Sequence, residues 1–177
     1  KKMLSSSNLS ATETIAVQTV LVHKYQQLKE WDICLNYCQA QVALAHQQNN
    51  TLAEATFYKL IGGTYYYIPQ KENAIAYWKK CIEIAEPNEY NALLAQCYHN
   101  VGVISFEGTD YKLAEKYFIK AIDLSKQNND TASTTFSLHY RLLATTYDAE
   151  NMLDKAEVIF KDIIAKTRAA KDSANLA

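Results

Sequence analysis

The 177-residue chain contains few residues that break helices: four are glycine and two are proline. Glycine and proline disfavour helix interiors. Long stretches of this sequence therefore contain nothing that would end a helix. Their scarcity agrees with an all-α protein.

Long apolar runs and a surplus of positive charge are also missing. The sequence has no run of about 18 apolar residues, so no segment of it is expected to span a bilayer. The formal net charge is −1, whereas proteins that bind nucleic acid or anionic membranes usually carry a basic surplus. Nucleic acid and membrane are therefore not expected as partners of this segment.

The sequence does contain an internal repeat. Four small residues lie 40, 40 and 42 positions apart and begin similar runs: Cys34, Ala74, Ala114 and Ala156. Repetition at this length is typical of arrays in which each unit buries its apolar face against its neighbours. The core is expected between adjacent units and not around one centre.

Two apolar stripes recur in each repeat. The first consists of Leu21, Ile61, Val101 and Leu143, each followed by a residue of modest size, namely Val22, Gly62, Gly102 and Ala144. The second begins at the four small residues above and continues four positions later with Cys38, Trp78, Phe118 and Phe160. Offsets of three and four residues indicate amphipathic helices. We expect the small residues to let two helices approach and the aromatic residues to fill the space beside them.

The stripes predict four helical hairpins. The expected helices cover residues 11–28, 32–48, 51–67, 70–86, 89–107, 110–127, 131–149 and 152–169. The units are therefore 11–48, 51–86, 89–127 and 131–169, within a single repeat domain over 1–177. The chain is expected to be a fragment of a longer protein.

Capping residues predict where these helices begin. Ser10 and Thr51 each precede a glutamate by three positions, which is the spacing of a capping box at the start of a first helix. Asp32, Asp110 and Asn151 are candidates for the start of second helices.

The repeat resembles the tetratricopeptide repeat, which has an aromatic residue, Leu-Gly and Tyr on its first helix and Ala, aromatic, Ala on its second. The second unit shows this pattern as Tyr58, Ile61, Gly62, Tyr65, Ala74, Trp78 and Cys81. The resemblance implies a right-handed α-α superhelix of four hairpins that binds proteins or peptides. Repeats of about 40 residues exceed the usual 34 and look like those of bacterial sensory and regulatory proteins. The first unit is degenerate, with Gln18, Cys38 and Gln41 at the pattern positions.

The resemblance also implies a peptide-binding groove on the inner surface of the superhelix. Its expected residues are Lys59, Tyr66, His99, Asn100, Phe106 and Arg141. The asparagine can bond a peptide backbone, the rings offer flat apolar area, and Lys59 or Arg141 can meet a carboxylate. A peptide of acidic character is the expected ligand. The alternative is that these residues form an ordinary solvated helix face.

No catalytic or metal-binding constellation is present in the sequence. Cys34 and Cys38 occupy columns filled elsewhere by alanine and an aromatic residue, so we expect buried thiols and not metal ligands. The four histidines lack paired acidic residues that would orient them. An enzyme, a metal and a cofactor are therefore not expected.

The leading functional hypothesis is a protein- or peptide-binding module within a larger bacterial regulatory protein. One alternative is a structural module that assembles through its terminal helices, for example as a homodimer. A small-molecule sensor with a closed pocket is another. The cysteines, which show no disulfide framework, favour the cytoplasm slightly, and the periplasm stays open if an upstream signal was removed.

Overall fold

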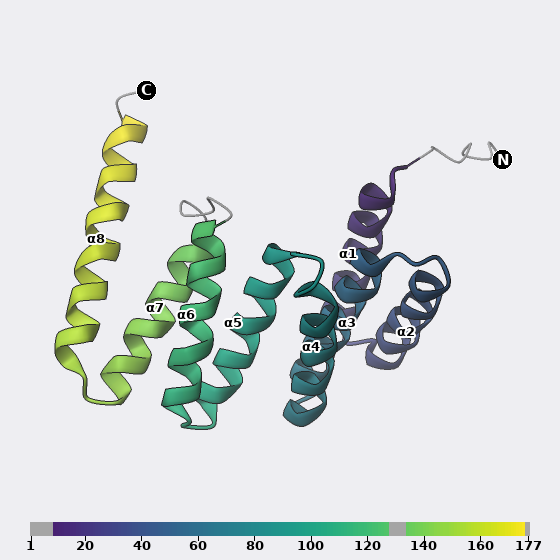
Figure 1. Cartoon of the computed structure of the whole chain (residues 1–177), viewed down its shortest axis with the longest axis horizontal. Helices are drawn as coiled ribbons and strands as arrows, with labels where there is room; N and C mark the ends of the chain where they lie inside the picture. Colours follow the sequence, from purple (N-terminus) through teal and green to yellow (C-terminus); the bar gives the residue numbers. More distant parts are fainter. Residues whose placement is uncertain (1–8, 128–133, 176–177) are drawn as a thin grey trace. The chain divides into compact units, whose positions relative to one another are not determined.

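The computed structural model describes residues 9–127 and 134–175, and these residues form eight α-helices and no strand (Figure 1). The helices are α1 (Ala11–Gln27), α2 (Trp31–Gln47), α3 (Thr51–Tyr67), α4 (Lys71–Ala85), α5 (Asn91–Glu107), α6 (Tyr111–Gln127), α7 (Thr134–Ala149) and α8 (Leu153–Asn175). The all-α prediction is confirmed. The largest difference from the predicted bounds is at α8, which continues six residues beyond the predicted end. The predicted start of the seventh helix, 131–133, lies outside the described residues.

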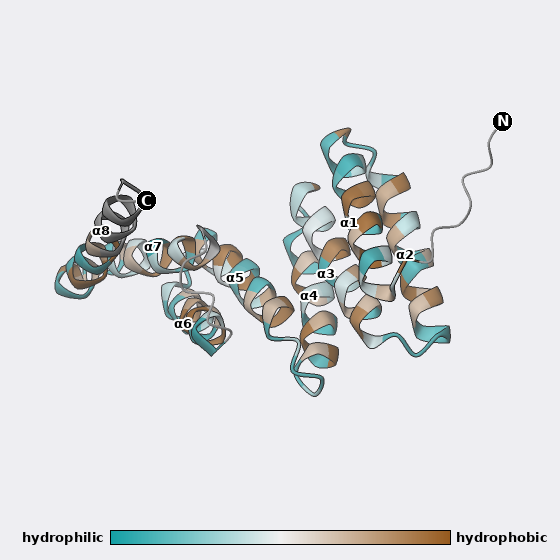
Figure 2. Cartoon of the chain, turned by 90° about the horizontal axis from the view of Figure 1, so that it is seen from above, coloured by the Kyte–Doolittle hydropathy of each residue, from teal (hydrophilic) through white to brown (hydrophobic). Residues whose placement is uncertain are grey.

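The chain divides into two compact units, one containing α1 to α4 and the other α5 to α8. In the first unit, α1 contacts α2 and α3, α2 contacts α3, and α3 contacts α4. In the second unit, α6 contacts α5 and α7, and α7 contacts α5 and α8. Hydrophobic and hydrophilic stretches alternate along the helices in Figure 2, as expected of amphipathic helices. Whether 1–177 acts as a single domain stays a prediction.

The predicted packing of small against large residues is confirmed in both units. A Cβ atom added to Gly62 of α3 would lie 2.5 Å from the indole of Trp78 on α4. A Cβ atom added to Gly102 of α5 would lie 2.7 Å from the ring of Phe118 on α6. Trp78 is 2% exposed and its Nε1 donates a hydrogen bond to the Lys59 carbonyl oxygen over 3.1 Å. Each glycine thus provides the space that the aromatic ring of the neighbouring helix occupies.

The capping predictions are partly correct. Ser10 and Glu13 form the expected capping box of α1, and the Asp110 carboxylate accepts a hydrogen bond from the Leu113 amide at the start of α6. The α3 cap is not Thr51 but the preceding Asn50, whose Oδ1 accepts from the Ala53 amide over 3.1 Å. Asparagine one position earlier can reach the free amides of the first turn, so the helix begins with threonine inside it.

The other two expected caps are wrong. Asp32 lies inside the first turn of α2, because the helix already begins at Trp31 after Glu30. Asn151 lies in the turn before α8 with φ of 58°. Asparagine tolerates this left-handed conformation better than most residues, which explains its place in a turn.

The turns between helices are closed by main-chain hydrogen bonds around a residue in the left-handed region. After α5 this residue is Thr109, with φ of 62°, although Gly108 directly precedes it. The Thr109 amide donates to the Phe106 carbonyl and the Asp110 amide to the Ser105 carbonyl, over 3.0 Å and 2.9 Å. This is the Schellman arrangement, which most often uses glycine at the left-handed position. Here a β-branched residue holds that conformation.

Replacing Thr109 with glycine is therefore expected to stabilise the protein by about 1 kcal/mol, because a non-glycine residue pays roughly 1–2 kcal/mol in this conformation. Chemical denaturation of the wild type and the variant measures the difference. Thr109→Asn should give a smaller gain. A loss of stability in both variants would contradict the strain assigned to Thr109.

Candidate functional site

A surface pocket of about 450 Å³ lies in the first unit between the end of α1, the start of α2 and the end of α3. Its lining residues are His23, Gln26, Gln27, Lys29, Trp31 and Tyr67. We call it the Trp31 pocket. It combines two aromatic side chains, two amides, a histidine and a lysine, and none of the six is acidic.

The turn between α1 and α2 brings these residues together. Lys29 has φ of 58°, and the Glu30 amide donates to the Tyr25 carbonyl over 3.0 Å, so α2 starts directly at Trp31. The indole of Trp31 stacks on Tyr67 of α3, with ring centroids 6.2 Å apart and planes inclined by 18°. The last turn of α3 is thereby joined to the first turn of α2.

Contacts between α1 and α3 form the floor of this region. Gln26 Nε2 donates a hydrogen bond to Thr64 Oγ1 over 3.0 Å. Tyr67 is 60% exposed, so its ring offers apolar area to a ligand. Tyr66 lies beside it, with ring centroids 6.1 Å apart, and also contacts Trp78. The site therefore combines a hydrogen-bonded contact between α1 and α3 with an accessible tyrosine ring.

The residues that line the pocket include one lysine, Lys29, and no carboxylate. Burial, and secondly the charge of Lys59, lower the pKa of His23. His23 is therefore neutral at pH 7, while Lys29 and Lys59 carry positive charge. A carboxylate close to this surface would meet two cations and an uncharged imidazole.

The predicted groove residues belong to both units. Lys59 and Tyr66 lie on α3 next to the Trp31 pocket, although neither lines it. Arg141 is exposed on α7, and Asn100 is half-buried on α5. Phe106 packs against Tyr111, with ring centroids 5.5 Å apart. A groove that uses all six residues stays a prediction.

Trp31 and Tyr67 were not among the predicted site residues. Neither belongs to a repeat column that points to a binding surface, and their stacking depends on the turn at Lys29. The signals available in the sequence were a tryptophan next to a predicted helix start and the Tyr65-Tyr66-Tyr67 run of the next unit.

Comparison with known proteins now identifies the repeat. The family model for the tetratricopeptide repeat matches residues 95–128, which cover most of α5 and all of α6. The chain contains a tetratricopeptide repeat. No curated protein matches it by sequence.

Solved structures show the same tetratricopeptide-repeat fold over nearly the whole chain. The apo form of RapI has a TM-score of 0.75 at 17% identity, with 96% of this chain and 62% of that chain covered. BtubC (BKLC) from P. vanneervenii has a TM-score of 0.75 at 16% identity, with 97% of this chain and 68% of that chain covered. A putative kinesin light chain from Podosopora anserina with nearly identical TPR-like repeats has a TM-score of 0.72 at 14% identity. The match covers 88% of this chain and 76% of that chain. The chain thus spans 62% of the length of RapI, and these likenesses establish an all-α repeat fold.

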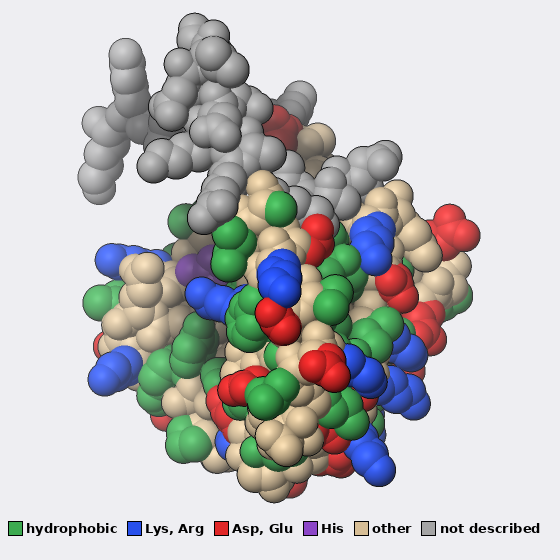
Figure 3. Space-filling model, turned by 90° about the vertical axis from the view of Figure 1, so that its left-hand side faces the viewer, with side chains coloured by type: hydrophobic (Ala, Val, Ile, Leu, Met, Phe, Trp, Pro, Cys, Tyr) green, Lys and Arg blue, Asp and Glu red, His purple; other side chains and the backbone are tan. Residues whose placement is uncertain are grey.

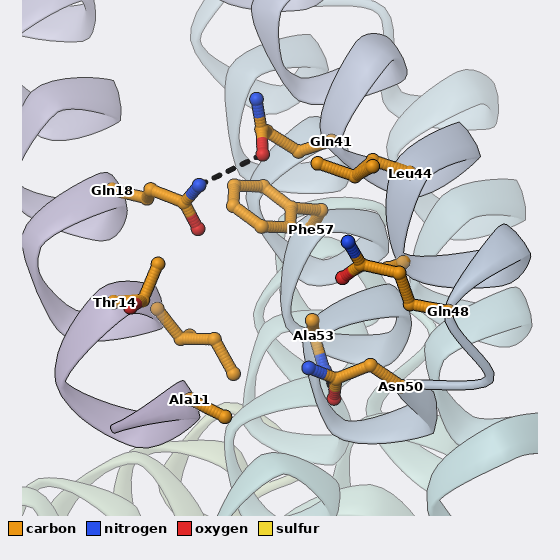
Figure 4. Close-up of a pocket in the computed structure, with 11 residues that line it drawn as sticks. Ala11, Thr14, Gln18, Gln41, Leu44, Gln48, Asn50, Ala53 and Phe57 are labelled. Atoms are coloured by element: carbon orange, nitrogen blue, oxygen red, sulfur yellow. Dashed lines mark hydrogen bonds between the residues drawn. The ribbon is translucent and has the colours of Figure 1, made fainter. Parts of the chain in front are cut away.

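A second pocket, of about 240 Å³, lies between α1 and α2 of the degenerate first repeat and α3 of the next repeat (Figure 4). Gln18 Nε2 donates a hydrogen bond to Gln41 Oε1 over 2.8 Å at one side, and Phe57 lies beside this pair. Gln18 replaces the tyrosine that the other repeats carry at this position, Tyr58, Tyr98 and Tyr140. The shorter side chain leaves space that a tyrosine would fill.

The four cysteines are free and buried, as expected for Cys34, Cys38 and Cys81 from their columns. The hydrogen bond that the Cys38 thiol donates to Cys34, together with burial, raises the pKa of Cys38, so this thiol stays protonated. Among the described residues, no group of three or more His, Cys, Asp or Glu side chains could hold a metal ion. None of the described helices combines the length and hydrophobicity needed to cross a bilayer.

In the second unit, the tetratricopeptide-repeat helices α5 and α7 place two histidine rings in contact. His99 and His139 have centroids 4.8 Å apart, and His99 also lies 6.1 Å from the Phe118 ring. His139 is fully buried. His99 Nδ1 is buried and has no hydrogen-bond partner among the described residues.

Burial lowers the pKa of His99, because the charged imidazolium loses hydration.

This shift predicts that acid destabilises the tetratricopeptide repeats. The unfolded chain binds a proton at His99 as pH falls through about 6.5, while the folded chain does not, so stability is lost below that pH. Each unit of pKa difference corresponds to about 1.4 kcal/mol. Thermal unfolding should show a lower Tm at pH 5.5 than at pH 7.5, and His99→Gln should reduce the difference. An unchanged difference in that variant would show that His99 is not its source.

Proposed function

We propose that this chain binds an acidic peptide segment of a protein partner through the Trp31 pocket, as the interaction part of a larger bacterial regulatory protein. The tetratricopeptide-repeat fold is generally a protein-interaction module and typically a non-catalytic scaffold. The stretched repeat, which resembles that of bacterial sensory proteins, supports the regulatory context.

The observation that supports the site most strongly is the stack of half-buried Trp31 on exposed Tyr67, beside Lys29 and Lys59. Stacked rings held by two helices present flat apolar area at little cost in conformational entropy. The lysines favour a carboxylate next to it. A peptide with one aromatic or aliphatic side chain followed or preceded by Asp or Glu satisfies both requirements.

Selection from a random displayed-peptide library on the intact chain tests this proposal. The selected peptides should be enriched in acidic residues next to an apolar one, and their binding should change the fluorescence of Trp31. Trp78, the other tryptophan, is buried and should contribute no change.

Two variants identify the site. Lys29→Glu and Tyr67→Ala should each weaken the selected peptides by about tenfold or more, or about 1.4 kcal/mol, while the exposed Lys112→Glu on α6 should not. Peptides that bind all three variants like the wild type would rule out the Trp31 pocket.

A further inference from the structure

The outer face of α1 exposes apolar side chains that the repeat buries elsewhere. Val17 and Val20 are 59% and 69% exposed, and Leu21 is 38% exposed. One period later, the aligned residues of α3 are almost fully buried: Phe57, Leu60 and Ile61 at 1%, 3% and 1%. These three pack in one cluster with Cys34 and Cys38 of the preceding helix α2. In α3 this face is covered by the second helix of the repeat before it. No such helix covers the α1 face among the described residues.

The face of α8 shows the reverse situation. Phe160 and Ile164 are 38% and 51% exposed, whereas the aligned residues of α6, Phe118 and Ile122, are 0% and 4% exposed. Phe118 and Ile122 pack in one cluster with Phe136, Leu143 and Tyr147 of the following helix α7. Figure 3 faces the side on which α8 lies and shows hydrophobic side chains exposed between charged ones. In α6 this face is covered by the first helix of the next repeat. No such helix covers the α8 face among the described residues.

A polar contact between α6 and α7 also has counterparts on the two exposed faces. Tyr147 Oη donates a hydrogen bond to the Glu115 carboxylate over 2.7 Å. Glu157 of α8 aligns with Glu115, and its side chain is 62% exposed. Tyr25 of α1 aligns with Tyr147. The apolar and polar residue types that α6 contributes to its contact with α7 are therefore also present on α8, and those that α7 contributes are also present on α1.

We propose that a second copy of this chain covers these faces, with α8 of one molecule packed against α1 of the next in the manner of α6 against α7. In this joint, Phe160 and Ile164 of one copy meet Val17 and Leu21 of the other, and Tyr25 donates to Glu157. The two surfaces differ, so the association is heterologous and can continue beyond a dimer. The Trp31 pocket shares no residue with either face, so this inference stands independently of the proposed function.

Sedimentation velocity of the intact chain tests the joint. The wild type should form dimers and larger species as its concentration rises. Phe160→Glu, or Ile164→Glu if the first variant loses helix content by circular dichroism, blocks the α8 face and should give a monomer. Val17→Glu blocks the α1 face and should also give a monomer. The matched control Val158→Glu lies on α8 at an exposed position aligned with exposed Lys116, and it should associate like the wild type.

Mixing the two blocked variants distinguishes this arrangement from any symmetric one. Val17→Glu retains a free α8 face and Phe160→Glu a free α1 face, so their equimolar mixture should form a dimer that grows no further. Self-association of either blocked variant alone would overturn the proposal, because it would require a joint between like faces. A wild type that stays monomeric at every concentration would overturn it as well.

Discussion

Replacing Trp78 with alanine is expected to lower the free energy of unfolding by about 3 to 5 kcal/mol, the range measured for buried aromatic truncations. The indole is 2% exposed and fills the space that Gly62 leaves on α3. Its removal creates a cavity that a glycine cannot fill, and it leaves the Lys59 carbonyl oxygen without the 3.1 Å hydrogen bond from Nε1. Urea denaturation followed by far-ultraviolet circular dichroism measures the loss.

Trp31→Ala is the matched control for this substitution. Trp31 is half-buried at the surface and stacks on an exposed tyrosine, so its truncation removes less buried area. The Trp31 variant should lose clearly less stability than the Trp78 variant. Equal losses would contradict the central role of the Gly62–Trp78 contact in the first unit.

The adjacent glycines of α3 should respond in opposite directions to alanine. A Cβ atom at Gly62 would lie 2.5 Å from the Trp78 indole and 3.0 Å from the Ala74 carbonyl oxygen, so Gly62→Ala forces the helices apart. Overpacking of this kind costs about 1 to 3 kcal/mol. A Cβ atom at Gly63 would meet nothing closer than Gln26 Nε2 at 4.0 Å. Gly63→Ala should therefore stabilise the helix by about 0.5 to 1 kcal/mol.

Chemical denaturation of the two variants gives the test, because the substitutions are chemically identical and one residue apart. Destabilisation by both would mean that α3 needs glycine for a reason other than helix approach. A stable Gly62→Ala variant with an unchanged Trp78 fluorescence spectrum would contradict the close packing of α3 on α4.

The helix order and the core could be predicted from the sequence because both depend on periodicity. Ala74, Trp78, Gly102 and Phe118 recur at fixed offsets, and these offsets place them on facing stripes whatever the details of the turns. Thr51 was predicted as a cap because its spacing to Glu54 matches a capping box, yet Asn50 provides a competing cap one position earlier. A local pattern cannot decide between two adjacent residues that both have a suitable oxygen.

The candidate site was predicted less completely than the core. Lys59 and Tyr66 came from a repeat column and lie beside the Trp31 pocket. Trp31 and Tyr67 come together only through the left-handed turn at Lys29, which no periodic pattern indicates. Binding residues that lie at helix ends therefore need three-dimensional information that residues in the middle of a helix do not.

The turns around Lys29 and Thr109 obtain their geometry from amide and carbonyl groups, which every non-proline residue possesses. Different side chains can consequently stand at these corners while the path of the chain is preserved, at a cost of about 1–2 kcal/mol for a non-glycine residue in the left-handed conformation. Lys29 illustrates the benefit, since a residue at a structural corner also lines the Trp31 pocket. Recognition chemistry in such a scaffold can be altered at the bends without redesigning the helices that they connect.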